Sequence, residues 1–479
     1  MGNMVFSNIF YSKAKCQFAR IQEVIREEDF MIIFRTKKNS DQSVKKDYLL
    51  EHGLVLGETG SQKECATTWA PSPSGVFLGA VRSGGCLGFG KRESVTYIGG
   101  SPILAVGRAR AGFTTCIAIP TLLSAKGQYL VAPDINGEYY KALSGCLKDA
   151  ALKFDPASED TVHYNPLEFV RIGTEYALPD IMHVAHALIG DLDTGWVFAK
   201  MASTVIVDAI QQVFAEGERL HDAVPSTDQK AVLEDGMNYS DLRYANPDIT
   251  LNAVYRLIHD TPEKLDHLRG GRDVIWWSGV INAAESILSL FAEPTVAAAT
   301  ADCEGLRSGY RKGIFLVAGA CDVQRFTPLF RVIVEQQLRD GCGGPTLLHG
   351  KNSLIVLDDF PMMGYLPSLH EALIKRGLQI ILHTHCIRGI HEVYGVAANN
   401  ILKNCVIRVY LSPPILPGDE GPSHEVWKAI GADENSAVIY CNSELATVVD
   451  KVRGPKNKVC IGNRAKRNDT HGNLRSERA

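Results

Sequence analysis

The feature of this chain that most constrains its fold is a short apolar segment that runs into a glycine-bounded loop. The segment Ile103–Val106 is wholly apolar, the loop covers residues 107–114, and a helix is predicted to start near Thr114. A second apolar segment, residues 128–132, follows and ends at Pro133-Asp134. Strand, loop, helix and strand in this order form a βαβ unit, which builds a parallel sheet covered by helices. The chain is therefore predicted to contain an α/β domain.

The same alternation returns in the second half of the chain. The predicted elements there are strands at Gly313–Ala318, Ser353–Leu357, 378–383 and 406–411 and helices at 328–339 and 366–376. Residues 176–300 instead carry apolar residues at helical spacing. The predicted helices lie at 182–189, 197–214 and 250–258, around a loop at 223–247. We therefore predict an α/β sheet domain interrupted by an all-α insertion.

The loop at residues 107–114 has the glycine spacing of a phosphate-binding loop. Its sequence, Gly-Arg-Ala-Arg-Ala-Gly-Phe-Thr, fits G-x-x-x-x-G-K-[ST] except that Phe113 stands in the lysine position. In that motif the glycines let backbone N–H groups surround the phosphates, and the hydroxyl, here Thr114, binds Mg²⁺. The lysine neutralises charge on the β and γ phosphates, so its loss is expected to impair catalysis while the loop persists. Without its context, such a near-match also fits an ordinary strand-helix turn.

Two acidic residues supply that context. Asp358 and Asp359 come directly after the apolar strand Ser353–Leu357. In P-loop NTPases an acid at this place reaches Mg²⁺ beside the phosphate loop, and its neighbour polarises the attacking water. The alternative is a charged strand end that faces solvent. We expect the loop and the acidic pair to converge at the carboxyl edge of one parallel sheet.

These motifs, in this order, resemble the TraG family of type IV secretion coupling proteins. Residues 357–367, Leu-Asp-Asp-Phe-Pro-Met-Met-Gly-Tyr-Leu-Pro, are similar to that family's L-D-E-F-x-x-L-G-x-L-P, and residues 134–138 are similar to its D-P-K-G-E. Residues 165–167 match its N-P-L. Further similar stretches are 69–70, 77–79, 97–100, 119–123, 195–199, 314–316, 328–329, 393–395 and 404–405. The resemblance covers about residues 55–435.

The resemblance implies a P-loop NTPase fold, RecA-like, with a mostly parallel sheet and an inserted all-α domain. It implies ATP and Mg²⁺ as cofactors and a homo-hexameric ring on the cytoplasmic side of a bacterial inner membrane. The partners that it implies are single-stranded, relaxase-bound DNA or secreted protein cargo, together with components of the type IV secretion channel. The helical insertion is the part in which family members engage their cargo.

The resemblance also assigns roles to individual positions. The implied catalytic residues are Asp358, Asp359 and His385, and the implied Mg²⁺ ligands are Thr114 and Asp358. The implied ATP-binding residues are Gly107, Arg110, Gly112, Phe113, Thr114, Thr115, Asp134 and Glu138.

Several positions depart from the family's pattern, and most of them concern phosphate and water chemistry. Besides Phe113, alanine replaces serine at Ala111 and asparagine replaces lysine at Asn136. Asp359 stands for the family's glutamate and is one methylene shorter, so it is set back from a water that it must reach by a hydrogen bond. His385 stands for a glutamine. We therefore predict a retained fold with weak or absent ATP hydrolysis.

The predicted domain organisation combines these observations. Residues 1–60 form a poorly patterned N-terminal segment that contains one short strand candidate at 30–34. The nucleotide-binding domain comprises residues 61–175, with a β-rich lead-in at 75–100 and the phosphate loop, and residues 301–450, with the acidic pair. The all-α insertion covers 176–300, and a basic flexible tail covers 451–479.

Charge and hydropathy bear on partners and location. The net charge of −4 does not indicate a nucleic-acid binder, although basic residues are concentrated in the tail, which we interpret as a solvated, disordered end rather than a DNA contact. The twelve cysteines show no C-x-x-C spacing, and no signal peptide is visible, which favours reduced thiols in a cytoplasm. No run of 18 apolar residues occurs, and the family's N-terminal membrane helices are not found. We expect a cytoplasmic chain that associates with the inner membrane through partners.

Three hypotheses for function remain open. The first is a coupling protein that binds nucleotide at least weakly and still serves DNA transfer. The second is a catalytically inactive adaptor that binds cargo or partner proteins in a secretion assembly. The third is an unrelated α/β nucleotide-binding enzyme that shares only the fold. A helical insertion between the loop and the acidic pair argues against the third.

Overall fold

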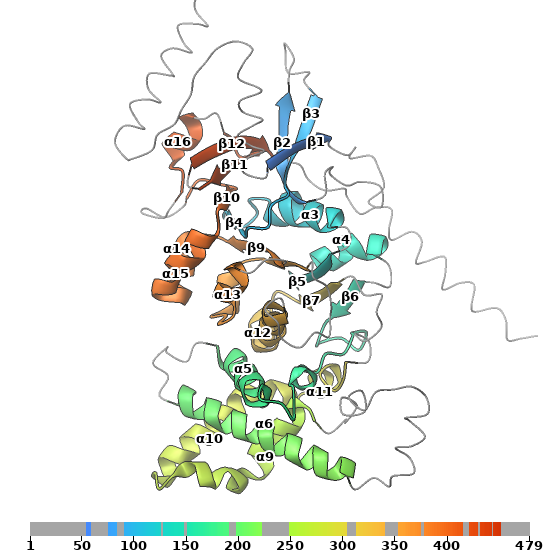
Figure 1. Cartoon of the computed structure of the whole chain (residues 1–479), viewed down its shortest axis with the longest axis vertical. Helices are drawn as coiled ribbons and strands as arrows, with labels where there is room; N and C mark the ends of the chain where they lie inside the picture. The colour runs from blue at the N-terminus through green and yellow to red at the C-terminus, as the bar shows by residue number, and fades with distance from the viewer. Residues whose placement is uncertain are drawn as a thin grey trace, which may run out of the picture. The chain divides into compact units, whose positions relative to one another are not determined.

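The structure of the protein is a computed structural model, and its helices and strands are drawn in Figure 1. It describes residues 54–58, 75–83, 91–125, 128–147, 151–190, 198–222, 249–303, 313–340, 353–374, 378–414, 421–429, 432–442 and 444–451. The chain forms two compact units. Unit 1 comprises Met1–Lys126, Val356–Phe360 and Gln379–Ala479, and unit 2 comprises Gly127–Ile355 and Pro361–Leu378.

The centre of unit 1 is a group of three parallel strands. They are β4 (Ile103–Val106), β9 (Leu378–Thr384) and β10 (Ile407–Tyr410), with β4 between the other two. All four residues of β4 are buried, as expected for a parallel strand covered on both faces, which is why it is apolar throughout. The parallel arrangement brings the carboxyl ends of these strands to one edge.

Antiparallel strands extend this sheet on one side. The order of strands in unit 1 is β1-β3-β2-β12-β11-β10-β4-β9. The added strands are β1 (Leu54–Glu58), β2 (Val76–Ser83), β3 (Lys91–Tyr97), β11 (Ser436–Cys441) and β12 (Glu444–Asp450). The antiparallel pair β2 and β3 lies within residues 75–100, before the phosphate loop, where a β-rich lead-in is predicted.

Short helices complete unit 1. The chain leaves β4 through the loop and enters η2 (Thr114–Ala118), a π-helical turn that continues as α3 (Ile119–Ser124). Thr121 fastens this helix to the lead-in, because its hydroxyl accepts the N–H of Phe77 at 3.0 Å. The remaining helices are α14 (Ile387–Tyr394), η9 (Gly395–Ala397), α15 (Ala398–Asn404) and α16 (His424–Ala429).

Unit 2 contains a second parallel group of strands, in the order β8-β5-β7-β6. They are β5 (Tyr129–Ile135), β6 (Ala151–Phe154), β7 (Gly313–Ala318) and β8 (Ser353–Leu357), whose last two residues belong to unit 1. Pro133 lies within β5 although it lacks an N–H group. It is tolerated because β5 pairs with β8 only as far as Val131.

Helices α4 (Glu138–Leu147), η8 (Phe360–Met363), α12 (Val323–Asp340) and α13 (Leu369–Ile374) accompany these strands. Between β6 and β7, every element of the described residues is helical, as predicted for the insertion (Figure 1). These elements are η4 (Pro166–Phe169), α5 (Ala177–Ile189), α6 (Ala199–Asp222), α9 (Leu251–Asp260), η5 (Pro262–Arg269), α10 (Val274–Leu288), η6 (Ser289–Ala292) and α11 (Pro294–Ala299).

Helix α10 is a strongly apolar helix of the insertion. The stretch Val274–Ala292 is long and apolar enough to cross a membrane by length and composition. Its side chains Trp277, Val280 and Ala284 are buried, and it packs against α6 and α9. The indole N–H of Trp277 donates a hydrogen bond to Asp266 at 3.0 Å. These contacts are those of a core helix in a helical domain.

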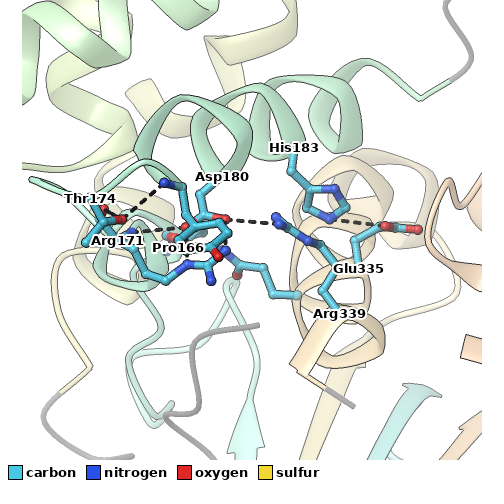
Figure 2. Close-up of polar contacts among 9 residues, drawn as sticks. Pro166, Arg171, Thr174, Asp180, His183, Glu335 and Arg339 are labelled. Atoms are coloured by element: carbon cyan, nitrogen blue, oxygen red, sulfur yellow. Dashed lines mark hydrogen bonds and ion pairs between the residues drawn. The ribbon is translucent and has the colours of Figure 1, made fainter. Parts of the chain in front are cut away.

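A polar network joins the first helix of the insertion, α5, to α12 within unit 2 (Figure 2). The carboxylate of Asp180 accepts two hydrogen bonds of 2.8 Å from the Arg171 guanidinium and one of 3.0 Å from Arg339. Nearby, the His183 ring faces the buried carboxylate of Glu335 at 3.1 Å, and Figure 2 shows both pairs between the two helices. The network ties the insertion to the part of the unit that carries the sheet.

Most predicted strands are confirmed, but several element ends are wrong. Helix α12 starts at Val323, five residues before the predicted start at Pro328, and keeps this proline inside. Its first turn is already closed upstream, because Val323 N–H donates to Gly319 O at 3.1 Å. The strand at 406–411 is not the last strand, since β11 and β12 follow it. The predicted strand at 30–34 and loop at 223–247 lie outside the described residues.

Candidate functional site

The phosphate loop, residues 107–114, leaves the carboxyl end of β4 between β9 and β10. Gly107 donates its N–H to Thr384 O of β9 at 3.0 Å. On the other side, a Cβ at Gly107 would lie only 2.7 Å from the Cβ of Leu411, so no larger residue fits there. The Arg108 N–H donates to the Ser412 hydroxyl at 3.2 Å. The loop is thus held at its start by both neighbouring strands.

The middle of the loop is a tight turn. Ala111 N–H donates to Arg108 O at 2.9 Å, and Arg110 and Gly112 both have positive φ, at 65° and 105°. The Arg108 and Arg110 side chains are exposed. Cys116 N–H then donates to Gly112 O at 2.8 Å, which starts the following helix. The predicted loop shape, from strand through glycine turn to helix, is therefore present.

The acidic pair lies at this loop, within the same unit. The Thr114 hydroxyl donates to the Asp358 carboxylate at 3.3 Å, although 244 residues separate the two in sequence. This contact confirms the predicted convergence of the loop and the strand end. The two groups are oxygen donors of the kind that Mg²⁺ prefers. Their roles as metal ligands remain predictions.

Phe113 occupies the position of the motif's lysine and points into the protein. Its side chain is only 3% exposed. Its ring is stacked on the His383 ring, with centroids 4.3 Å apart and planes 6° apart. A buried aromatic stack therefore lies where the motif places a cation.

His383 joins the acidic pair to the loop. Its Nδ1 lies 2.6 Å from Asp358 Oδ1, and its Nε2 lies 3.3 Å from Gly107 O. His383 is not among the predicted site residues, whereas a catalytic role was predicted for His385. His385 Nδ1 lies 3.6 Å from Asp359 Oδ2, and its side chain is 47% exposed. The position of His383 level with Ala105 of β4 places it beside the loop, whereas His385 lies beyond the end of β9.

Burial shapes the chemistry of the second acid. Burial raises the pKa of Asp359 above its ordinary value of 3.8, the charges of His385 and His383 oppose the rise, and Asp358 adds to it. Asp359 also has a positive φ of 46°, at the sharp turn after β8. Shifted carboxylates in strained backbone are frequent at functional sites. The role of Asp359 in polarising water remains a prediction.

Two of the implied ATP-binding residues belong to unit 2. Asp134 accepts the N–H groups of Tyr139 at 2.9 Å and Tyr140 at 2.8 Å, so it binds the start of α4. Burial raises the pKa of Asp134 to about 6, against the effect of these hydrogen bonds. Glu138 is exposed, as is Thr115 of unit 1. Nucleotide contacts by these three residues remain predictions.

Lys451, predicted to start the flexible tail, is part of the fold of unit 1. Its Nζ donates to Leu411 O and to Glu434 O, both at 2.7 Å. Its side chain passes beside the loop, since a Cβ at Gly112 would lie 3.6 Å from Lys451 Cδ. Burial lowers the pKa of Lys451 below its ordinary value of 10.5. The tail boundary predicted at 451 is therefore too early by at least this residue.

Comparison with known proteins gives one family and several relatives. Residues 37–414 match the family described as type IV secretory system conjugative DNA transfer. Conjugal transfer protein TraG of Escherichia coli is 28% identical over 343 residues, which cover 64% of this chain and 50% of that protein. Protein VirD4 of Rhizobium radiobacter is 26% identical over 351 residues, which cover 68% and 49%. The chain spans about half the length of these relatives.

Solved structures of the plasmid coupling protein TrwB share the fold. Its complex with ADP and Mg²⁺ has a TM-score of 0.54 at 13% identity, over 74% of this chain and 86% of that chain. Its complex with the GTP analogue GDPNP has the same TM-score at 14% identity, over 74% and 87%. At this level of identity the likeness shows the fold, which is that of a P-loop NTPase, as predicted.

Proposed function

Because the chain belongs to the type IV secretory system conjugative DNA transfer family, we propose that it acts as the cytoplasmic part of a coupling protein. In this role it binds ATP at least weakly, hydrolyses it poorly, and brings DNA or protein cargo to a secretion channel. The family assignment carries the first part of the proposal. It also removes the hypothesis of an unrelated enzyme that shares only the fold.

The observation that carries the impaired hydrolysis is the burial of Phe113 in the lysine position. A lysine there places a positive charge against the β and γ phosphates. Phe113 supplies no charge, and its ring is 3% exposed against His383 instead of reaching outward. Removing one positioned group that stabilises transition-state charge costs roughly 10²–10³-fold in rate. Arg110 and Arg108 are exposed arginines of the loop, but neither starts the helix as position 113 does.

The proposed cofactors are ATP and Mg²⁺. The plasmid coupling protein TrwB has been solved with ADP and Mg²⁺. In the present chain the backbone of the loop provides the N–H groups for phosphates, and Thr114 and Asp358 provide oxygen donors in contact at 3.3 Å. Bound Mg²⁺ supplies charge neutralisation on the phosphates. The Asp358 carboxylate is also held by His383, which supports weak metal binding.

The remaining parts of the proposal concern assembly. The expected state is a homo-hexamer associated with the inner membrane through channel components, with the helical insertion engaging the cargo. Relaxase-bound single-stranded DNA and secreted proteins are the two classes of cargo. The second candidate function is an adaptor without catalysis. The uncharged side chain of Phe113 in the lysine position is the observation that favours it, and an absence of ATP turnover would support it over an active motor.

The test compares ATP hydrolysis by the wild-type chain with that of Phe113→Lys under single-turnover conditions. We expect Phe113→Lys to be at least about tenfold faster, because it regains the charge at the phosphates. Wild-type hydrolysis at the rate of this variant contradicts the impaired site. Salt-sensitive binding of single-stranded DNA with measurable turnover supports the coupling protein. Binding of cargo or partner proteins without turnover supports the adaptor.

A further inference from the structure

Both ring nitrogens of His383 and one face of its ring have close neighbours. One nitrogen lies 2.6 Å from the Asp358 carboxylate, and the other lies 3.3 Å from the carbonyl oxygen of Gly107. One face of the ring is covered by Phe113 at 4.3 Å. The ring thus links the acidic pair, the first residue of the phosphate loop and the residue in the lysine position.

Two of these contacts engage the carboxylate oxygens of Asp358, which are the atoms that would bind a metal. Its Oδ1 is engaged by His383, and its Oδ2 accepts from the Thr114 hydroxyl at 3.3 Å. Mg²⁺ requires nearly ideal octahedral geometry at about 2.0–2.1 Å from its oxygen ligands. The ring nitrogen of His383, 2.6 Å from Oδ1, competes with the ion for the lone pairs of that oxygen. The donors fit Mg²⁺ in kind, but each carboxylate oxygen of Asp358 already has a partner with which the ion must compete.

A simpler interpretation is a buried histidine that packs at the end of a strand. Such a residue needs one hydrogen-bond partner and an apolar neighbour. His383 instead has an oxygen acceptor opposite each nitrogen, and both acceptors belong to the parts of the site that surround phosphate and metal in P-loop proteins. The arrangement is a link within the nucleotide site rather than packing alone.

We propose that His383, stacked on Phe113, holds Asp358 against the phosphate loop in place of Mg²⁺, so that this chain binds ATP without depending on the metal. The inference rests on the proposed function, because it concerns the nucleotide site of that coupling protein. His383 is a positioning residue in this account. Phe113 and His383 have separable effects. Phe113 supplies no positive charge to the phosphates, whereas His383 keeps the Asp358 carboxylate from the metal.

The test measures equilibrium binding of a fluorescent ATP analogue in excess Mg²⁺ and in EDTA. The wild-type chain is expected to bind with affinities that agree within about twofold in the two conditions, a difference below half a kcal/mol. Phe113→Lys is expected to bind more tightly in both conditions. His383→Gln and the double variant Phe113→Lys, His383→Gln are expected to bind at least about tenfold more tightly in Mg²⁺ than in EDTA, because Asp358 is released. His370→Gln, a change at an exposed histidine of α13, is the control.

Several results would overturn the proposal that ATP binding does not depend on Mg²⁺. Tenfold or stronger Mg²⁺ dependence in the wild-type chain overturns the proposal without any variant, so the test survives a failure of His383→Gln to fold. Equal affinities of the folded double variant in Mg²⁺ and EDTA also overturn it, as does a lack of binding by every variant. Fast ATP turnover by the wild-type chain contradicts the impaired hydrolysis instead. Turnover and the Mg²⁺ profile of binding are separate measurements, so the two failures can be told apart.

Discussion

At the scale of single residues, the phosphate loop depends on a glycine whose backbone other residues rarely adopt. Gly112 has φ of 105°, and an added Cβ would lie 3.2 Å from the sulfur of Cys116. We therefore predict that Gly112→Ala lowers the free energy of unfolding by about 2 kcal/mol, measured by urea denaturation. Gly100→Ala is the control, since a Cβ there meets no atom within 4 Å. Equal stability of the two variants would show that the strained turn is absent.

A second residue-scale prediction concerns the buried carboxyl group of Asp134. Its pKa is raised from 3.8 to about 6 in the folded chain, so the folded state holds a proton that the unfolded state has released between these values. Its contribution to stability is therefore full below pH 3.8 and is lost as the pH rises through about 6. The loss amounts to about 3 kcal/mol.

The variant Asp134→Asn has no such proton and isolates this contribution. Urea denaturation at several pH values should show the stability of the wild-type chain falling, relative to that of the variant, between pH 4 and pH 6, by about 1.4 kcal/mol per pH unit. Above pH 7 the difference should be constant. A difference that is independent of pH throughout would mean that Asp134 is ionised in the folded state.

At the scale of elements, the helical insertion is attached to α12 through charged groups. Burial by itself raises the pKa of Asp180, but the hydrogen bonds and charges of Arg171 and Arg339 outweigh it and lower the pKa below 3.8. Asp180→Asn leaves both guanidinium groups without their counter-ion in a site where the carboxylate is only 4% exposed. Breaking such a buried pair costs about 3–5 kcal/mol. The measurement is the free energy of unfolding at neutral pH.

The control for this change is Asp260→Asn, at the exposed end of α9. It should alter stability by less than about 0.5 kcal/mol. The stabilisation by Asp180 should also disappear on acidification, because its pKa is lowered and its contribution is lost as the pH falls below 3.8. If the two variants unfold alike at neutral pH, the network does not hold the insertion in place.

Sequence alone predicted the buried parallel strands well and the ends of other elements poorly. Strands β4, β7 and β8 were located to the residue because both their faces are covered, so their apolar runs are continuous and end sharply. The hairpin of β11 and β12 was missed although its two apolar runs meet at Asn442, a residue with φ of 50°. Asparagine is typical of tight hairpin turns because it tolerates positive φ, so the residue type between the two runs was a signal that the sequence offered.

In the candidate site too, some residues could be predicted from the sequence and others could not. The loop and Asp358 could be predicted because short motifs encode them directly. His383 could not, because its role depends on which residue of β9 stands level with the end of β4, and pairing register is a property of the sheet. Lys451 was assigned to the tail because charge and composition do not show where a last strand ends. The positions of His383 and Lys451 depend on contacts between distant strands, so short motifs could not predict them.

At the scale of the whole molecule, charge is distributed very unevenly along the chain. Residues 452–479 contain eight basic and two acidic side chains, a net charge of +6, which leaves −10 on residues 1–451 of the total of −4. Binding of single-stranded DNA depends on neutralising phosphates, and the net charge of −10 on residues 1–451 opposes the approach of a polyanion. If the chain binds DNA directly, residues 452–479 add long-range attraction through their charge, even as a solvated end that makes no dedicated DNA contact.

We therefore predict that removing residues 452–479 weakens binding of single-stranded DNA and flattens its salt dependence. The slope of log affinity against log salt should fall by about 0.7 for each phosphate that the segment neutralises. The matched control retains the segment's length but replaces its lysines and arginines by glutamine, and it should behave like the deletion because the effect is one of charge. Unchanged affinity and slope in both variants would place the DNA contact on the folded units, where the helical insertion is then the first region to examine.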